Sequence, residues 1–287
     1  MQDLQGSPSA SGWEGRRETG GYVLAVGAEP PRISVVIPTY QRLEACRRAI
    51  SSALEQELPA LEVLVCDDGS TDGTEEALQG WARDEPQLHY LRLPRNFGAP
   101  AAARNLGTER ARGDWVAFLD DDDVWLPGKL RVQGEAISSG GFDLVACDAT
   151  RSGGQPYFGL ERASEPDRAE LLRHNPIITS TAVVRRSALI AAGGFTDSAV
   201  GMSIKGVEDY AAWLNLAYRG ARIVVLPDQL VLYEDTGEQR VSSAAARQEA
   251  EVAAVRWRLW MRRPYDLAVA GSALRGTLDA WKWRRRS

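Results

Sequence analysis

The sequence predicts an α/β protein with a mostly parallel, Rossmann-like sheet flanked by helices and followed by a helical C-terminal tail. The first observation is that short apolar runs alternate four times with segments of helical periodicity between residues 33 and 119. The second is that these runs are almost continuously apolar, which is typical of strands buried on both faces of a parallel sheet. The third is that three of the runs end in polar clusters, at the edge where doubly wound sheets bind ligands.

The strands of the first half are expected where β-branched and aromatic residues gather. They are predicted at 33–37, 61–66, 88–93 and 115–119. A helix is expected at 43–54, after Pro38 ends the first strand, and another at 99–111. Between them, Asp72 and Glu75 have the spacing of a capping box, which predicts the start of a further helix.

The second half predicts a less regular pattern. Strands are predicted at 142–147, 177–184 and 223–226, the last closed by Pro227. Helices are predicted at 128–137, 187–192, 207–218, 238–261 and 268–286. Residues 150–174 show no clear periodicity. The chain would therefore consist of a loose leader at 1–31, one domain at 32–235 and a helical, basic tail at 236–287.

The charge distribution narrows the function classes. The net charge is −5, but residues 251–287 hold nine Arg and Lys against three acidic residues, a net of +6 that leaves −11 on the remainder. Such an acidic body argues against binding nucleic acid, whereas a basic tail rich in tryptophan is suited to peripheral contact with an anionic membrane. The alternative for the tail is a helix that packs Trp257 and Trp260 on the domain while its arginines stay solvated.

Cysteine usage and hydropathy bear on the compartment. Three scattered cysteines without metal-type spacing indicate buried thiols in a reducing environment. The first 30 residues lack the apolar segment of a signal peptide, and no stretch reaches the ~20 apolar residues that cross a bilayer. We therefore expect a cytoplasmic protein, peripheral on the inner face of the membrane if the tail binds lipid.

Four consecutive aspartates, at 120–123, follow the fourth predicted strand. Adjacent carboxylates repel one another and cannot be buried without partners. A divalent metal is the obvious partner, since Mg²⁺ is often bound by one or two carboxylates together with phosphate oxygens. A solvated acidic turn is the alternative. Polar residues at 39–42 and 67–68 end two other strands, and the predicted fold brings all three clusters to one edge of the sheet.

Six motifs, in order and in spacing, resemble the family 2 glycosyltransferases, which have the GT-A fold. They lie at 33–42, 63–74, 96–107, 114–130, 193–195 and 207–210. The resemblance covers roughly 32–235 and divides it into a nucleotide-binding half, 32–125, and an acceptor half, 126–235. It implies an inverting, metal-dependent enzyme that uses Mn²⁺ or Mg²⁺. The enzyme would move a sugar from a nucleotide-diphosphate sugar, with a UDP-sugar favoured, to an acceptor hydroxyl.

The resemblance also implies a donor site. The nucleotide-binding residues would be Pro38, Thr39, Tyr40, Asp68, Arg104 and Asp121. Asp68 would accept a hydrogen bond from the base, with stabilisation of its own turn as the alternative. Arg104 would face the phosphates, with an ordinary surface arginine as the alternative. The metal ligands would be Asp122 and then Asp120, while Asp121 leans toward the ribose and Asp123 is structural.

The same resemblance implies catalytic and acceptor residues. Asp209 would be the general base, with Glu208 as a neighbour that helps to raise its pKa. Plain electrostatics at the start of a helix is the alternative for this acidic pair. The acceptor side is more weakly indicated, at Trp125, Asn175, Thr179 and Trp213. For Trp213, helical spacing favours a place in the core over stacking on a sugar.

The expected role is in polysaccharide, glycolipid or glycoconjugate synthesis, with a nucleotide-sugar donor and a carbohydrate or lipid-linked acceptor as partners. A sugar nucleotidyltransferase would share the sheet and the metal carboxylates, but it needs a Gly-rich loop that 38–42 does not provide. A non-catalytic nucleotide-sugar-binding protein is the second alternative. The presence of both Asp122 and Asp209 argues against it.

Overall fold

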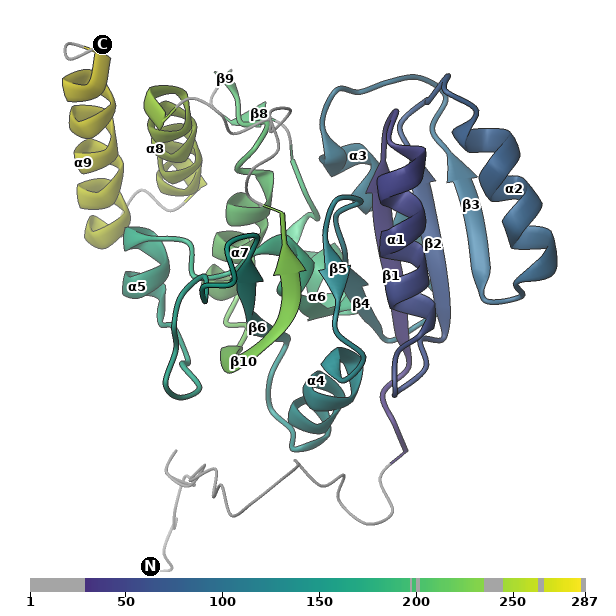
Figure 1. The fold of residues 1–287 in the computed structure, drawn as a ribbon. Coiled ribbons are helices and arrows are strands. Elements are labelled where there is room, and N and C mark those ends of the chain that lie inside the picture. The colour runs from purple at the N-terminus through teal and green to yellow at the C-terminus, as the bar shows by residue number, and fades with distance from the viewer. Residues whose placement is uncertain (1–28, 197, 200–201, 235–244, 263–265, 285–287) are drawn as a thin grey trace, which may run out of the picture.

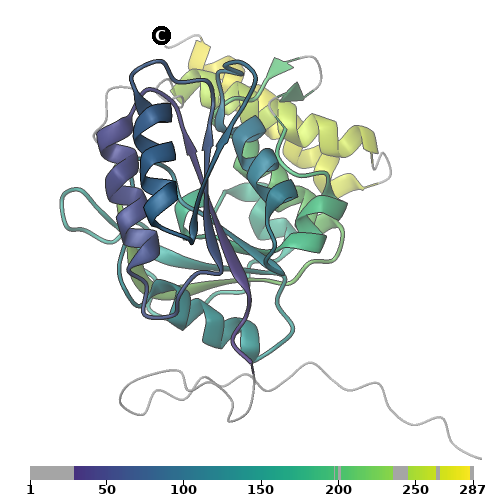
Figure 2. The same cartoon turned by 90° about the vertical axis from the view of Figure 1, so that its right-hand side faces the viewer.

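The structure is a computed structural model that describes residues 29–196, 198–199, 202–234, 245–262 and 266–284. One central sheet lies between layers of helices, which is the expected α/β architecture (Figures 1 and 2). The leader predicted at 1–31 falls almost entirely outside the described residues, as does the start of the helix predicted at 238–261.

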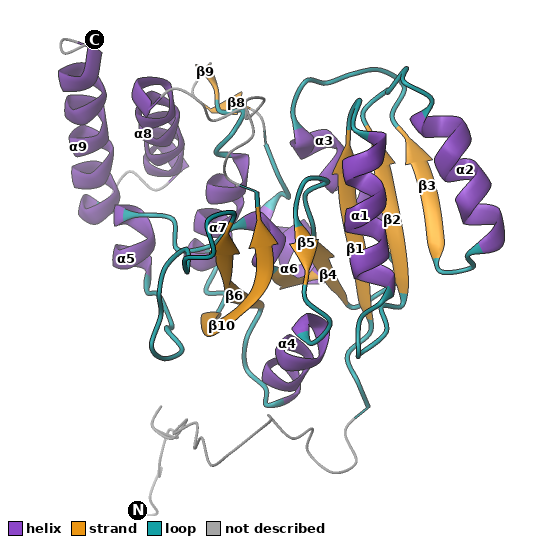
Figure 3. Ribbon diagram, viewed as in Figure 1, coloured by secondary structure: helices purple, strands orange, loops and turns teal. Residues whose placement is uncertain are grey.

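Eight strands form the central sheet, in the order β3-β2-β1-β4-β7-β6-β10-β5. Figure 3 draws the strands in orange. They are β1 (Ile33–Thr39), β2 (Glu62–Asp67), β3 (Leu88–Arg92), β4 (Trp115–Phe118), β5 (Val124–Trp125), β6 (Leu144–Arg151), β7 (Val183–Arg185) and β10 (Ile223–Tyr233). The first four pair in parallel, as predicted, whereas β7 and β5 run antiparallel to their neighbours. A separate small pair is formed by β8 (Ser198–Ala199) and β9 (Met202–Ser203).

Helices cover both faces of the sheet because successive strand residues point to opposite sides. One face packs against α1 (Leu43–Leu54), α2 (Thr74–Asp84) and α4 (Lys129–Ser138). The other packs against α3 (Pro100–Arg110), α5 (Arg168–Arg173), α6 (Arg186–Ala192) and α7 (Glu208–Tyr218). In β1, Val35 and Ile37 belong to the first core and Val36 to the second. Helix α3 approaches β1 closely because Gly107 has no side chain, and a Cβ there would overlap Val36.

Two strands continue through prolines that were expected to end them. β1 extends past Pro38, because β4 pairs only with its first four residues, Ile33 to Val36. Beyond them one side of β1 is an edge, where a missing N–H is tolerated. β10 extends past Pro227, where its register with β6 shifts between Leu226 and Gln229. Such an irregularity accommodates a residue that cannot donate to the ladder.

Two other predictions were wrong in part. Only the end of the strand predicted at 177–184 forms, as β7, because a 3₁₀ turn, η1 (Thr179–Thr181), precedes it. The capping box is absent: Asp72 accepts hydrogen bonds from the N–H and hydroxyl of Thr74, and Glu75 pairs instead with Arg92. The other predicted strands and helices lie within a few residues of their predicted bounds, whereas α5 (Arg168–Arg173), β5, β8 and β9 were not predicted.

The tail forms two helices, α8 (Ala245–Arg262) and α9 (Leu267–Arg284), which pack side by side and against α7 and α5 respectively (Figure 1). Trp257 and Trp260 make an edge-to-face contact with ring centroids 5.3 Å apart, and the Trp257 indole N–H donates to Thr277. These contacts favour the packing interpretation of the tail, and membrane contact stays a prediction. No helix within the described residues is long and apolar enough to cross a membrane.

Candidate active site

A cavity of about 1080 Å³ lies at the carboxyl edge of the sheet. It brings together most of the residues that the sequence singled out. Its lining includes Pro38, Thr39, Tyr40, Asp68, Arg104, Asp120, Asp121, Asp122, Asp123, Asn175, Thr179, Glu208 and Asp209. Residues more than 170 positions apart in the chain therefore share one site, because the parallel strands all deliver their carboxyl ends to this edge.

Trp125 and Trp213 do not line this cavity, and their assignment to the acceptor side is corrected. Trp125 is 2% exposed, its indole N–H donates to the Ser180 carbonyl, and the Lys129 ammonium lies 3.9 Å from its ring centroid. Trp213 is fully buried against Phe195, with ring centroids 5.8 Å apart. Neither ring has an open face on which a sugar can stack.

Two arginines neutralise the acidic run. Arg42 pairs with Asp122 at 2.9 Å and with Asp121 at 3.3 Å, and Asp121 also accepts a hydrogen bond from the Thr39 hydroxyl at 2.7 Å. Arg104 pairs with Asp120 at 2.6 Å. Burial, reinforced by the neighbouring Asp122, raises the pKa of Asp121 to about 7, against the opposing effect of Thr39 and Arg42. The run is therefore not the freely solvated turn of the alternative interpretation.

Asp123 has a different environment from the other three aspartates. It is 1% exposed and accepts hydrogen bonds from the Ser180 hydroxyl and from the backbone N–H of Glu234. Burial, and then the charge of Asp120, raises its pKa well above the usual range. These contacts join the acidic run to the end of β10 and suit a structural role.

The Arg104 guanidinium is buried, so the interpretation as an ordinary surface arginine was wrong. The residue is 4% exposed and bridges two carboxylates, Asp120 at 2.6 Å and Glu208 at 3.2 Å. It thereby connects α3 with the acidic run and with the first turn of α7. These two pairs use two of the five N–H donors of the guanidinium, and its Nε–H has no acceptor among the described residues.

Asp68 also has partners that its motif did not reveal. Its carboxylate accepts hydrogen bonds from the backbone N–H groups of Phe97 and Gly98, at 2.9 to 3.1 Å. It thus holds the turn before α3, rather than its own turn, at the rim of the cavity. Burial raises the pKa of Asp68 in spite of these bonds. A carboxylate has about four acceptor positions, so a further bond from a base remains open to it.

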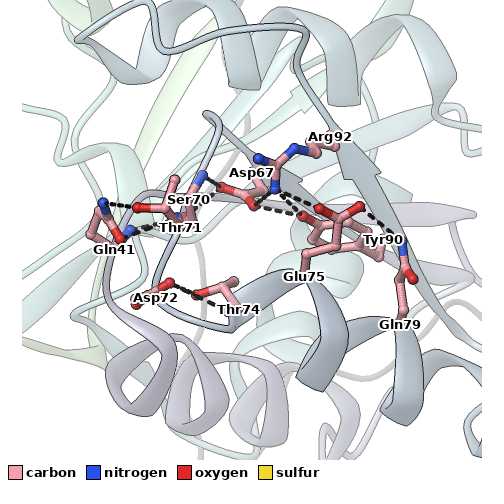
Figure 4. Close-up of polar contacts among 10 residues, drawn as sticks. All are labelled: Gln41, Asp67, Ser70, Thr71, Asp72, Thr74, Glu75, Gln79, Tyr90 and Arg92. Atoms are coloured by element: carbon pink, nitrogen blue, oxygen red, sulfur yellow. Dashed lines mark hydrogen bonds and ion pairs between the residues drawn. The ribbon is translucent and has the colours of Figure 1, made fainter.

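Asp67 fixes the neighbouring loop between β2 and α2. Its carboxylate accepts from the N–H and hydroxyl of Ser70 at 2.8 and 2.6 Å, and from the Tyr90 hydroxyl at 2.6 Å (Figure 4). Arg92 lies 3.4 Å away, between Asp67 and Glu75. Asp67 is fully buried and does not line the cavity, so it supports the site from behind.

Asp209 lies in the first turn of α7 and is partly exposed to the cavity. It accepts hydrogen bonds from the Thr179 hydroxyl at 3.0 Å and from the Tyr210 N–H at 2.7 Å. Burial, and then the charge of Glu208, raises the pKa of Asp209 to about 6, while Arg104 opposes the shift. Glu208 is itself held by Arg104 and by the Gly206 N–H. Asp209 is therefore the less constrained member of the pair.

The cavity lining also contains residues that the sequence analysis missed. Arg173 is the last residue of α5 and His174 follows it, while Val252 and Arg256 come from α8. The tail helix thus forms part of the cavity wall. In the sequence, the segment that forms α8 shows only a mixture of tryptophan and arginine. This mixture does not indicate which face of the helix lines a cavity.

The chemistry of the acidic run fits a hard divalent cation. Its donors are carboxylate oxygens, and the Asp122 side chain is 26% exposed in the cavity. Within the described residues, no cluster of three or more Asp, Glu, His or Cys is arranged to hold a metal by itself. A cation bound at Asp122 would take one or two carboxylates and complete its coordination with phosphate oxygens and water.

Comparison with known proteins adds independent findings. The model of the family described as "Glycosyl transferase family 2" matches residues 34–191. The teichuronic acid biosynthesis glycosyltransferase TuaG of Bacillus subtilis is 34% identical over 66% of this chain and 73% of its own length. A Campylobacter jejuni protein named GalNAc(5)-diNAcBac-PP-undecaprenol beta-1,3-glucosyltransferase is 32% identical over 50% of this chain, which spans 48% of that protein.

Solved structures share the fold. TarS 1-349 of S. aureus, in complex with UDP-GlcNAc, has a TM-score of 0.66 and 23% identity over 80% of this chain and 66% of its own. The mannosyltransferase PcManGT of Pyrobaculum calidifontis, in complex with GDP-Man and Mn²⁺, has a TM-score of 0.66 and 21% identity over 90% of this chain and 76% of its own. The fold is that of GT-A glycosyltransferases, as the sequence predicted.

Proposed function

This chain belongs to glycosyltransferase family 2, and from that premise we propose that it transfers a sugar, with inversion, from a UDP-sugar to an acceptor hydroxyl with the aid of Mn²⁺ or Mg²⁺. The observation that carries the proposal is that one cavity contains both the acidic run and Asp209. Donor and acceptor can therefore meet in one cavity.

Asp209 is the proposed general base. With a pKa of about 6 it is ionised near neutral pH and still basic enough to accept a proton. It removes the proton from the acceptor hydroxyl while that oxygen forms a bond to the anomeric carbon. The bond from this carbon to the diphosphate oxygen breaks, and the nucleoside diphosphate leaves from the opposite face. A single displacement inverts the carbon and requires no covalent nucleophile, unlike a retaining glycosidase.

The donor end would bind the nucleotide through residues at the ends of β1 and β2. Pro38, Thr39 and Tyr40 would surround the nucleoside, Asp68 would accept from the base, and Asp121 would face the ribose. Arg104 would hold Asp120 and Glu208 in place, and its remaining N–H donors would face the phosphates.

Asp122, with Asp120, would hold the cation. When bound, the cation supplies positive charge that stabilises the leaving diphosphate. Arg42 now occupies the space beside Asp122 and Asp121, so it must give way, at least in part, when ligands arrive. Its guanidinium keeps the carboxylates neutralised until then.

The names of the relatives support a place in glycan assembly. We propose a role in polysaccharide, glycolipid or glycoconjugate synthesis, with a carbohydrate or lipid-linked acceptor, on the cytoplasmic side of the membrane. A sugar nucleotidyltransferase is disfavoured by the family match and by the absence of glycine at 38–42.

The test is turnover of UDP-, GDP- and dTDP-sugars with Mn²⁺ by the wild type and by Asp209→Asn. We expect a UDP-sugar to be consumed, and Asp209→Asn to lower kcat by roughly 10²- to 10⁴-fold, the usual contribution of a general base. Affinity for the donor should be unchanged. Asp84→Asn, at the exposed end of α2, is the matched control and should behave as wild type. Full activity of Asp209→Asn would refute the proposed base.

A further inference from the structure

Arg256 is a buried cation without a carboxylate partner. It is 8% exposed and lines the cavity from α8. One terminal nitrogen donates to the Arg173 carbonyl at 3.2 Å, while its Nε–H has no acceptor among the described residues. No carboxylate in the described part of the chain forms an ion pair with it.

Burying the Arg256 guanidinium costs free energy unless a neighbouring group supplies negative charge. A buried ion without a counter-ion loses its hydration without compensation. The other buried arginine of the cavity, Arg104, forms ion pairs with two carboxylates. At Arg256 the missing partner coincides with an open cavity, which indicates that a ligand provides the anion.

A second arginine faces the same end of the cavity. Arg173, at the end of α5, is exposed and likewise has no carboxylate partner among the described residues. Two permanent positive charges and their forked donors match the charge and geometry of a phosphate group.

The position of these arginines relative to the proposed base is fixed. The Tyr210 hydroxyl donates to the Leu171 carbonyl at 2.6 Å, which ties α7 to α5. Tyr210 directly follows Asp209, and Leu171 lies two residues before Arg173. A ligand held by the arginines is therefore held at a set position with respect to Asp209.

We propose that Arg256 and Arg173 bind a phosphate group carried by the acceptor, so that the acceptor is a phosphate-bearing glycan or lipid. This inference rests on the proposed function, because it concerns the second substrate of the same reaction. The phosphate would orient the acceptor so that its hydroxyl reaches Asp209, while the donor occupies the acidic end.

Inorganic phosphate is the first probe. Its effect on the thermal unfolding midpoint is measured in EDTA for the wild type, Arg256→Met and Arg258→Gln. Arg258 is the matched control, since it lies on the same helix, donates to Thr196 and does not line the cavity. We expect phosphate to raise the midpoint of the wild type and of Arg258→Gln, and Arg256→Met to bind phosphate about tenfold more weakly or worse. Equal phosphate affinity in all three proteins would overturn the proposal.

The midpoint without phosphate separates ligand binding from a structural role. If Arg256 is kept for a ligand, replacing an unpaired buried charge by an apolar side chain of similar length should leave the midpoint unchanged or raise it. A lower midpoint together with unaltered phosphate affinity would assign Arg256 a structural role and overturn the proposal.

Hydrolysis of the UDP-sugar in the absence of acceptor is measured on the wild type and on Arg258→Gln, which does not line the cavity and should match the wild type. No hydrolysis and no transfer by the wild type would count against the proposed function, whereas the phosphate titration tests the arginines independently.

The source of the phosphate is distinguished with two further probes, a short-chain alkyl phosphate in solution and vesicles that contain phosphatidic acid. Binding of either probe that is lost in Arg256→Met supports the proposal and identifies a soluble or a membrane-held phosphate. Binding that is equal in the wild type and Arg256→Met with both probes contradicts it.

Discussion

The charged side chains at the two ends of the cavity differ in whether they have partners. The donor end is formed by the acidic run, and the acceptor end by Arg173 and Arg256. At the donor end each aspartate of the acidic run has a partner: Arg104 for Asp120, Arg42 for the next two, and Ser180 for Asp123. At the acceptor end, two arginines have no carboxylate partner within the described residues. From this difference we infer that arginines neutralise the carboxylates of the donor end, where a cation must compete with them. At the acceptor end the positive charge of the arginines is available to an anionic ligand.

The largest expected effect on stability concerns Arg104. Arg104→Met would leave Asp120 and Glu208 without their shared cation, and breaking a buried ion pair costs about 3–5 kcal/mol. The lower end of this range applies, because the Asp120 side chain is 29% exposed. The free energy of unfolding in urea measures the loss. Arg110→Met, on the same helix but exposed, should change it by less than about 0.5 kcal/mol. Similar values for the two variants would show that the donor end does not depend on its buried cation.

The next prediction concerns the pH dependence of kcat/KM, which the ionisation of Asp209 should set. Asp209 is active as a base only when ionised, and its pKa is raised to about 6. The value of kcat/KM should therefore fall about tenfold for each pH unit below 6, and level off above it.

A raised pKa also means that ionisation of Asp209 disfavours the folded state as pH rises from the ordinary 3.8 toward 6. Asp209→Asn should thus lose the acid limb and gain stability at neutral pH relative to the wild type. An unchanged acid limb in Asp209→Asn would assign the titration to another group.

The fold was largely predictable because its signals are local. Continuous apolar runs and helical periodicity identified the four parallel strands, and their order brought the polar clusters to one edge. The exceptions depended on neighbours that a local pattern does not include. Pro38 and Pro227 stay within strands only because β1 lacks a partner on one side there and β10 is irregular.

The site was predictable in its carboxylates but not in their partners. The acidic run, Asp68 and Asp209 stand in recognisable motifs, and all line the cavity. Arg104 stands in a motif, but its burial and its carboxylate partners were not predicted, and Arg256 looks like any other arginine in the sequence. Burial and pairing are set by tertiary contacts with distant segments. Trp125 and Trp213 were weakly indicated near the acceptor, with the core favoured for Trp213. Both rings lie in the core.

The division of the cavity into a donor end and an acceptor end is tested by the affinity for UDP. UDP is titrated, in the presence of Mn²⁺, into the wild type, Asp122→Asn and Arg256→Met in a calorimeter. We predict that Arg256→Met binds UDP as tightly as the wild type. Asp122→Asn should bind it roughly tenfold or more weakly, because a proposed ligand of the cation is lost. Wild-type affinity in Asp122→Asn, or an equal loss in Arg256→Met, would contradict the division of the cavity into a donor end and an acceptor end.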